Sequence, residues 1–193
     1  MQARDIIAKA IGVVTFLFAA FSGFLRHIAP PEEAGPHFAV GFSSVMTLCV
    51  LLLISALPRK KQTKASFWNI FLIVAGVLFM AAVVSGLVYK SNLERLTFPY
   101  PADSPAARHV RGTVYTPAAQ AELDQHSLKT IPALVADFGG ISALELVWTR
   151  DSINEAKMVL TINYVIVVLT IASGIFCLTE GLLVKQTRNR NAR

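Results

Sequence analysis

The chain has 193 residues, of which 54% are hydrophobic and 16% are charged, and its mean hydropathy is +0.54. An average soluble domain carries about 25% charged residues. The composition therefore excludes an ordinary soluble globular enzyme. It also excludes a disordered chain, which needs low hydrophobicity and high net charge.

Four apolar runs dominate the sequence. Residues 6–25 contain one charge, Lys9, whereas residues 38–57 and 67–89 contain none; residues 158–179 also contain none, and this run continues past Glu180 to residue 184. A helix needs about 20 apolar residues to cross a hydrocarbon core of roughly 30 Å. The sequence thus predicts an all-α integral membrane protein with a four-transmembrane-helix bundle. Residues 1–89 hold the first three helices and residues 158–184 the fourth.

The first run has an alternative interpretation as a cleaved signal peptide, because Arg4 and Lys9 accompany it. The run is long for the apolar part of a signal peptide. No clear small-residue cleavage site precedes Arg26. We therefore expect residues 6–25 to stay in the protein as a membrane span.

The basic residues predict the orientation of the bundle. The net charge is +6 and the isoelectric point is about 9.6. The short loop 58–66 and the tail 185–193 together carry eight basic residues and no acidic one. Loops of this kind stay in the cytoplasm. The N- and C-termini are thus predicted to be cytoplasmic, in a plasma membrane of the bacterial inner-membrane type. The basic balance reflects this orientation, with anionic lipid head groups as a secondary partner and no nucleic acid.

The segment 90–157, between the third and fourth helices, is the predicted extracytoplasmic part. Residues 98–101 contain two prolines and should be extended. Thr116-Pro117 should open a short helix at residues 118–127, and Gly139-Gly140 should stop another at residues 131–138. Residues 144–148 suit either a strand or a stretch on the membrane interface anchored by Trp148.

The fourth helix is expected to begin outside the bilayer. Ser152 and Glu155 have the spacing of a capping box just before an apolar run. The helix should therefore start near Ser152 and end near Lys185. A segment of this size buries little surface by itself, so we expect it to pack on the helix ends or on a partner. Its candidate partner-binding residues are the aromatic side chains Phe98, Tyr100, Tyr115, Phe138 and Trp148.

Sites for cofactors and metals find little support. The four histidines, His27, His37, His109 and His126, lie outside the spans or at their edges, so no pair is placed to ligate a membrane haem. His27 and His37 flank one short loop, but their spacing fits no common metal site. The nucleotide-binding loop, the zinc-protease motif and the nucleophile elbow are also missing. We predict no cofactor and no bound metal.

The cysteines bear on two membrane families. Four helices with a short and a long outer loop form a topology similar to that of quinone-linked disulfide-generating membrane proteins and of tetraspanins. Both families carry characteristic cysteines in their outer loops. Cys49 and Cys177 lie inside apolar runs instead, and the outer loops have no cysteine. We assign the chain to neither family and expect both cysteines to serve packing.

A few polar residues lie inside the spans. Such side chains usually contact a neighbouring helix, and a line of them can also border a pore. Small residues at four-residue spacing, at 19 and 23, 81 and 85, and 82 and 86, would let helices approach closely. The candidate polar contacts or pore residues are Asn163, Thr170, Ser173 and Glu180.

The leading functional hypothesis follows from these exclusions. We expect a non-catalytic interaction, assembly or sensing component that acts through its outer segment. Its partner would be another membrane or extracytoplasmic protein, or a second copy. The alternative is a small homo-oligomeric pore, suggested by the polar and small residues of the fourth helix. A membrane enzyme acting on lipid or quinone is the third alternative, without supporting residues.

Overall fold

The computed structural model describes residues 11–12, 15–16, 19, 29–31, 37–56, 65–102, 107–125 and 130–191. The predicted span 6–25 therefore lies mostly outside the described residues, as do most of the loops 26–37 and 58–66. The described chain is mostly helical. It forms two compact units, which are taken in turn.

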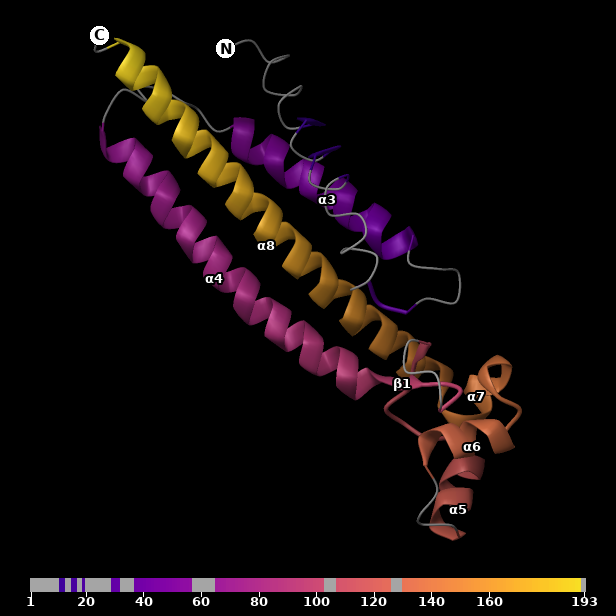
Figure 1. Ribbon diagram of the computed structural model, residues 1–193. Coiled ribbons are helices and arrows are strands. Elements are labelled where there is room, and N and C mark those ends of the chain that lie inside the picture. The colour runs from indigo at the N-terminus through magenta and orange to yellow at the C-terminus, as the bar shows by residue number, and fades with distance from the viewer. Residues whose placement is uncertain are drawn as a thin grey trace. The chain divides into compact units, whose positions relative to one another are not determined.

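Unit 1 comprises Met1–Ile28, His37–Leu87 and Tyr164–Arg193. Its described helices are α3 (His37–Ala56) and the greater parts of α4 (Ala65–Leu96) and α8 (Arg150–Asn191). These are the three long ribbons in Figure 1. Long uncharged apolar runs of this length are typical of helices that satisfy every backbone polar group within the segment.

Two of the described helices are long and apolar enough to cross a membrane. They are Asn69–Leu96, with 28 residues, and Arg150–Leu182, with 33 residues. Helix α3 carries a shorter apolar stretch, Ala39–Leu51. Of the residues in the most apolar stretch of each helix, 50% are buried in α8 and 11% are buried in α4. Of these two described helices, α8 is thus the more buried, and α4 keeps most of its apolar surface exposed.

Helix α8 contacts both of the other helices in unit 1. Tyr164 of α8 shares a side-chain hydrogen bond with Ser43 of α3. Gly174 of α8 lies against α4, where a Cβ atom on this glycine would stand 3.3 Å from Phe79 and 3.5 Å from Leu78. The missing side chain therefore permits a close approach of α8 and α4.

Unit 2 comprises Ala29–Pro36 and Val88–Asn163. It includes the last turns of α4 and the first turns of α8. Between them lie β1 (Thr97–Pro99), β2 (Arg108–Val110), α5 (Pro117–Gln125), α6 (Ile131–Asp137), a single 3₁₀ turn (Ile141–Ala143) and α7 (Leu144–Val147). The two strands are antiparallel, with Phe98 opposite His109.

Two local predictions for this segment are confirmed. Helix α5 begins at Pro117, and the Ala119 N–H donates to Thr116 Oγ1 at 3.3 Å, which is an N-cap contact. Helix α6 stops before Gly139 and Gly140, whose φ angles are +100° and +79°. The Gly140 N–H donates to Val135 at 2.8 Å and the Gly139 N–H to Ala136 at 3.2 Å, which is the Schellman pattern.

Two other predictions are wrong. Leu144–Val147 forms a helical turn rather than a strand, and Trp148 is 1% exposed, so it is no interfacial anchor. Helix α8 begins at Arg150, near the expected start at Ser152, but it ends at Asn191 rather than near Lys185, and the predicted capping box is wrong. Ser152 lies within its first turn and donates to the Thr149 carbonyl at 2.9 Å and to the Val114 carbonyl at 3.3 Å. The hydroxyl thus joins α8 to a distant loop instead of capping its end.

Candidate functional site

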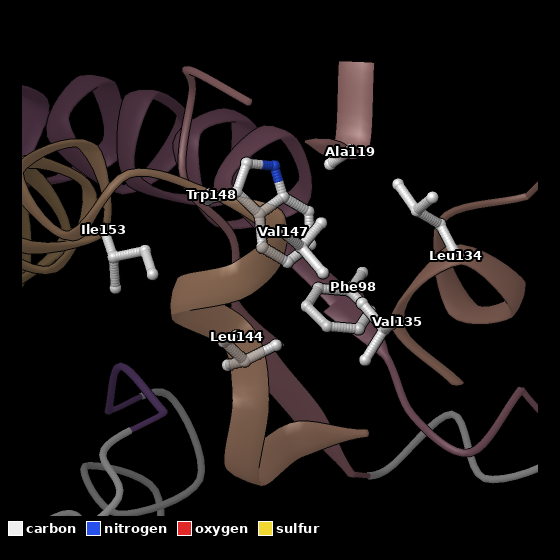
Figure 2. Packing of buried hydrophobic residues seen from close by; sticks show 8 residues of the cluster. All are labelled: Phe98, Ala119, Leu134, Val135, Leu144, Val147, Trp148 and Ile153. Atoms are coloured by element: carbon white, nitrogen blue, oxygen red, sulfur yellow. The ribbon is translucent and has the colours of Figure 1, made fainter. Parts of the chain in front are cut away.

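The most developed feature of unit 2 is an aromatic cluster around Trp148. The ring centroids of Phe98 and Trp148 are 5.5 Å apart with an interplanar angle of 46°, and those of Tyr115 and Trp148 are 5.9 Å apart with an interplanar angle of 28°. These distances suit favourable aromatic pairs. Figure 2 shows the buried side chains converging from β1, α5, α6, α7 and α8. Its buried members are Phe98, Ala119, Leu134, Val135, Leu144, Val147, Trp148 and Ile153.

A short backbone pairing holds the centre of this cluster together. Tyr115 and Trp148 form an isolated antiparallel bridge. On one side of it the Thr116 N–H donates to Val147 at 2.9 Å, and on the other the Thr149 N–H donates to Val114 at 3.0 Å. The Thr116 hydroxyl also donates to the Leu146 carbonyl at 2.5 Å. Backbone hydrogen bonds on both sides of Trp148 therefore join residues 114–116 to residues 147–149, some thirty residues later in the chain.

Gly112 packs closely against Trp148. A Cβ atom at this position would lie 2.6 Å from Trp148 Cβ and 2.9 Å from Trp148 Cγ, and it would collide with Ser152 Oγ. The backbone of Gly112 thus passes directly over the start of α8. The sequence alone does not reveal the role of Gly112, because nothing local distinguishes it from any other loop glycine.

The five aromatic residues predicted to bind a partner all gather at this cluster. Phe98 and Trp148 are buried inside it, while the other three are partly buried and packed against it: Tyr100, Tyr115 and Phe138. Their principal contacts are with one another and with the aliphatic core. In chemical terms the arrangement gives a small, ordered apolar core.

The four polar candidates on α8 are divided between the units. Asn163 belongs to unit 2 and is half-buried, whereas the other three belong to unit 1. The Thr170 hydroxyl donates to the carbonyls of Ile166 and Val167, both at 2.9 Å. Ser173 and Glu180 are buried. The Thr170 hydroxyl is therefore satisfied within its own helix.

The same pattern recurs on helix α3. Thr47 donates to the Ser43 carbonyl at 2.7 Å, and Ser43 donates to the Val40 carbonyl at 2.9 Å. Hydroxyls that bond to carbonyls three or four residues back need no water. On the described helices these contacts are consistent with helix packing and carry no specific sign of a pore.

Metal-binding groups are not assembled in the described part of the chain. Within it there is no group of three or more His, Cys, Asp or Glu side chains able to hold a metal ion. His109 lies opposite Phe98 in the β1–β2 ladder, with ring centroids 6.2 Å apart. Cys49 is exposed and Cys177 is buried, and both are free. His27 and His126 lie outside the described residues.

Comparison with known proteins adds no assignment. No protein-family model, no curated protein and no solved structure matches the chain.

Proposed function

We propose that this chain is a non-catalytic, multi-pass membrane protein that presents unit 2 to a protein partner outside the hydrocarbon layer. The observation that carries the proposal is the packed core around Trp148. It gives a segment of modest size its own ordered fold, in a chain with two helices apolar enough to span a membrane. An ordered unit with an aromatic core supports recognition by shape, whereas a disordered loop would have to be ordered on binding.

The number and direction of the spans belong to the same proposal. Helices α4 and α8 are two spans, α3 is a third, and the apolar run 6–25 is the fourth. The positive-inside pattern supports cytoplasmic termini and an outer position for unit 2, in a bacterial inner membrane. The exposed apolar residues of unit 2 that a partner would meet include Val114 and Leu146, which are 55% and 56% exposed.

The homo-oligomeric pore is the weaker alternative. Its candidate Thr170 is satisfied within α8, as are Ser43 and Thr47 within α3. No contact among the described residues favours a water-filled path over helix packing. A membrane enzyme acting on lipid or quinone gains no support from the described residues either.

The test is photo-crosslinking of the full chain in its native membrane. A photoreactive side chain at Leu146 on α7 should give one discrete heavier product, because this position lies on the exposed surface of unit 2. A matched probe at Val77 on α4 should not give that product. Replacing Trp148 by alanine should remove the product while the chain stays resistant to extraction from the membrane by carbonate.

Two outcomes would contradict the proposal. If Trp148→Ala leaves the Leu146 crosslinked product unchanged, the partner does not depend on the folded core of unit 2. The absence of any protein adduct from Leu146 and Val114 probes, in a correctly inserted chain, would show that unit 2 has no partner at this surface.

A further inference from the structure

Helix α4 has two opposite faces with the same spacing but different surroundings. The inward face carries residues spaced four, three, four and three apart, all buried or half-buried: Phe71, Ala75, Leu78, Ala82 and Ser85. The outward face repeats this spacing two residues further on, which is roughly 200° around the helix. Its members are 51% to 67% exposed: Ile70, Ile73, Val77, Met80, Val84 and Leu87.

The two faces also differ in side-chain size. Three of the five inward residues are small, namely Ala75, Ala82 and Ser85, and the small residue on the α8 side is Gly174, which lies against Leu78 and Phe79. Helices in membranes associate through small residues of this kind, because these let backbones approach. The outward face consists of large aliphatic side chains. Gly76 lies beside that face with nothing within 4 Å of its Cβ position, and the residues four positions away, Leu72 and Met80, are both large.

The outward face also matches the bilayer in polarity and length. From Ile70 to Leu87 it extends about 26 Å at 1.5 Å per residue. All six side chains are apolar, and the first charged residue beyond them is Lys90, which is exposed and pairs with Glu94 at 3.9 Å. The hydrocarbon core of a bilayer is about 30 Å thick. The face is thus nearly as long as the hydrocarbon core is thick. It has neither the small residues nor the polar groups through which membrane helices usually contact protein.

We propose that the outward face of α4, defined by the six residues from Ile70 to Leu87, is a lipid-facing surface whose occupant is phospholipid acyl chains. This inference rests on the proposed membrane location. It adds that α4 is an outer helix of unit 1 and that assembly partners do not dock on this face. Among the described residues, α4 meets Gly174 of α8 through Leu78 of the inward face and through Phe79 next to it.

The test compares neighbouring residues at equal depth. Single cysteines are placed at Val77 and Val84 on the outward face, and at their neighbours Leu78 and Ser85 on the inward face. The background is the full chain with Cys49→Ser and Cys177→Ala. Each cysteine is labelled with a nitroxide, and the protein is reconstituted in vesicles of phosphatidylcholine and phosphatidylglycerol.

Collision with dissolved oxygen, which concentrates in acyl chains, is then measured against collision with a water-soluble nickel chelate. The outward positions should collide with oxygen roughly twofold or more faster than their neighbours, because a label on an unpartnered face meets lipid from most directions. All four positions should exclude the chelate. No disulfide between copies should form at Val77→Cys under mild oxidation.

The outcomes separate this inference from the proposal on which it rests. Equal, low oxygen collision on both faces, with the chelate still excluded, would show that protein covers the outward face; the membrane location would stand and the inference would fall. A disulfide-linked dimer at Val77→Cys would identify a second copy as the occupant. Entry of the chelate at Val77 and Val84 would overturn the membrane location itself.

A pair of unlabelled variants checks the same inference without a probe. Val84→Phe should leave the thermal stability of the solubilised protein unchanged, since acyl chains or detergent yield to a larger side chain. Ala82→Phe should lower that stability, because it pushes a ring into the inward face. Equal losses from the two substitutions would contradict a lipid-facing outer surface.

Discussion

The close passage of Gly112 over Trp148 gives the sharpest quantitative prediction. Replacing Gly112 by alanine adds one methyl group, which would stand 2.6 Å from Trp148 Cβ, whereas ordinary contacts of this kind begin at 3.4 Å. Ser152 Oγ can rotate away from the new atom. Trp148 Cβ cannot, because it is fixed to the backbone between the Tyr115 bridge and α8. Relief therefore needs a backbone shift of nearly 1 Å.

Overpacking of this kind costs about 1–3 kcal/mol. A folded unit of roughly 80 residues has a free energy of unfolding of about 4–12 kcal/mol at the usual value per residue. Gly112→Ala should thus remove a substantial part of the stability of unit 2 without abolishing its fold. The φ angle of Gly112 lies outside the left-handed region, so backbone strain does not contribute.

The assay uses the full chain in detergent with Trp68→Phe, so that Trp148 is the remaining one of the two tryptophans. Denaturant unfolding followed by Trp148 emission should show a lower midpoint for Gly112→Ala. The exposed neighbour is the control, and Thr113→Ala should change the free energy of unfolding by no more than about 0.5 kcal/mol. Full recovery of Gly112→Ala by a second change, Ser152→Ala, would refute the reasoning, since the contact with Trp148 would then be unimportant.

Three further predictions concern the core, a turn and the helix contact. Trp148→Ala should cost unit 2 about 3–5 kcal/mol and make it sensitive to protease, and an unchanged digestion pattern would contradict the packed core. Gly140→Ala should cost about 1–3 kcal/mol because φ +79° and ψ −157° suit glycine alone, whereas Ser142→Ala on the neighbouring exposed turn should be nearly neutral in the same unfolding assay. Gly174→Leu should separate α8 from α4, seen as a longer distance between spin labels on the two helices, while Gly76→Leu at an open position should leave that distance unchanged.

Local turn chemistry was predictable because it depends on a few adjacent residues. Thr116 caps α5 through its own side chain, and Gly139-Gly140 end α6 because only glycine readily takes those φ angles. The serine–glutamate pair at 152 and 155 failed as a predictor for the opposite reason. The Ser152 hydroxyl donates to Val114, which is 38 residues earlier in the chain.

The aromatic residues of the candidate site were also hard to interpret from sequence, because their contacts come from distant parts of the chain. A tryptophan beside an apolar run is typical of a membrane interface, and exposed tyrosines are typical of binding surfaces. In this protein Trp148 instead completes a core with Phe98 and Tyr115, which come from other parts of the chain. Residue type identified the important side chains, but their burial depended on a pairing between distant segments.

The sequence by itself determined that this chain is mostly helical and that α4 and α8 are apolar enough for a bilayer, because run length and the absence of charge are local properties. It did not give the ends of these helices, Leu96 and Asn191, which lie beyond the predicted residues 89 and 185. It could not determine which side of α4 meets protein, since the helix is apolar all round and two opposite stripes share one spacing. Only the tertiary structure decided this, by placing Gly174 of α8 against Leu78 and leaving Val77 exposed. The physical reason is that contacts between apolar helices depend on the shape of the partner surface, and that shape exists only once the second helix is in place.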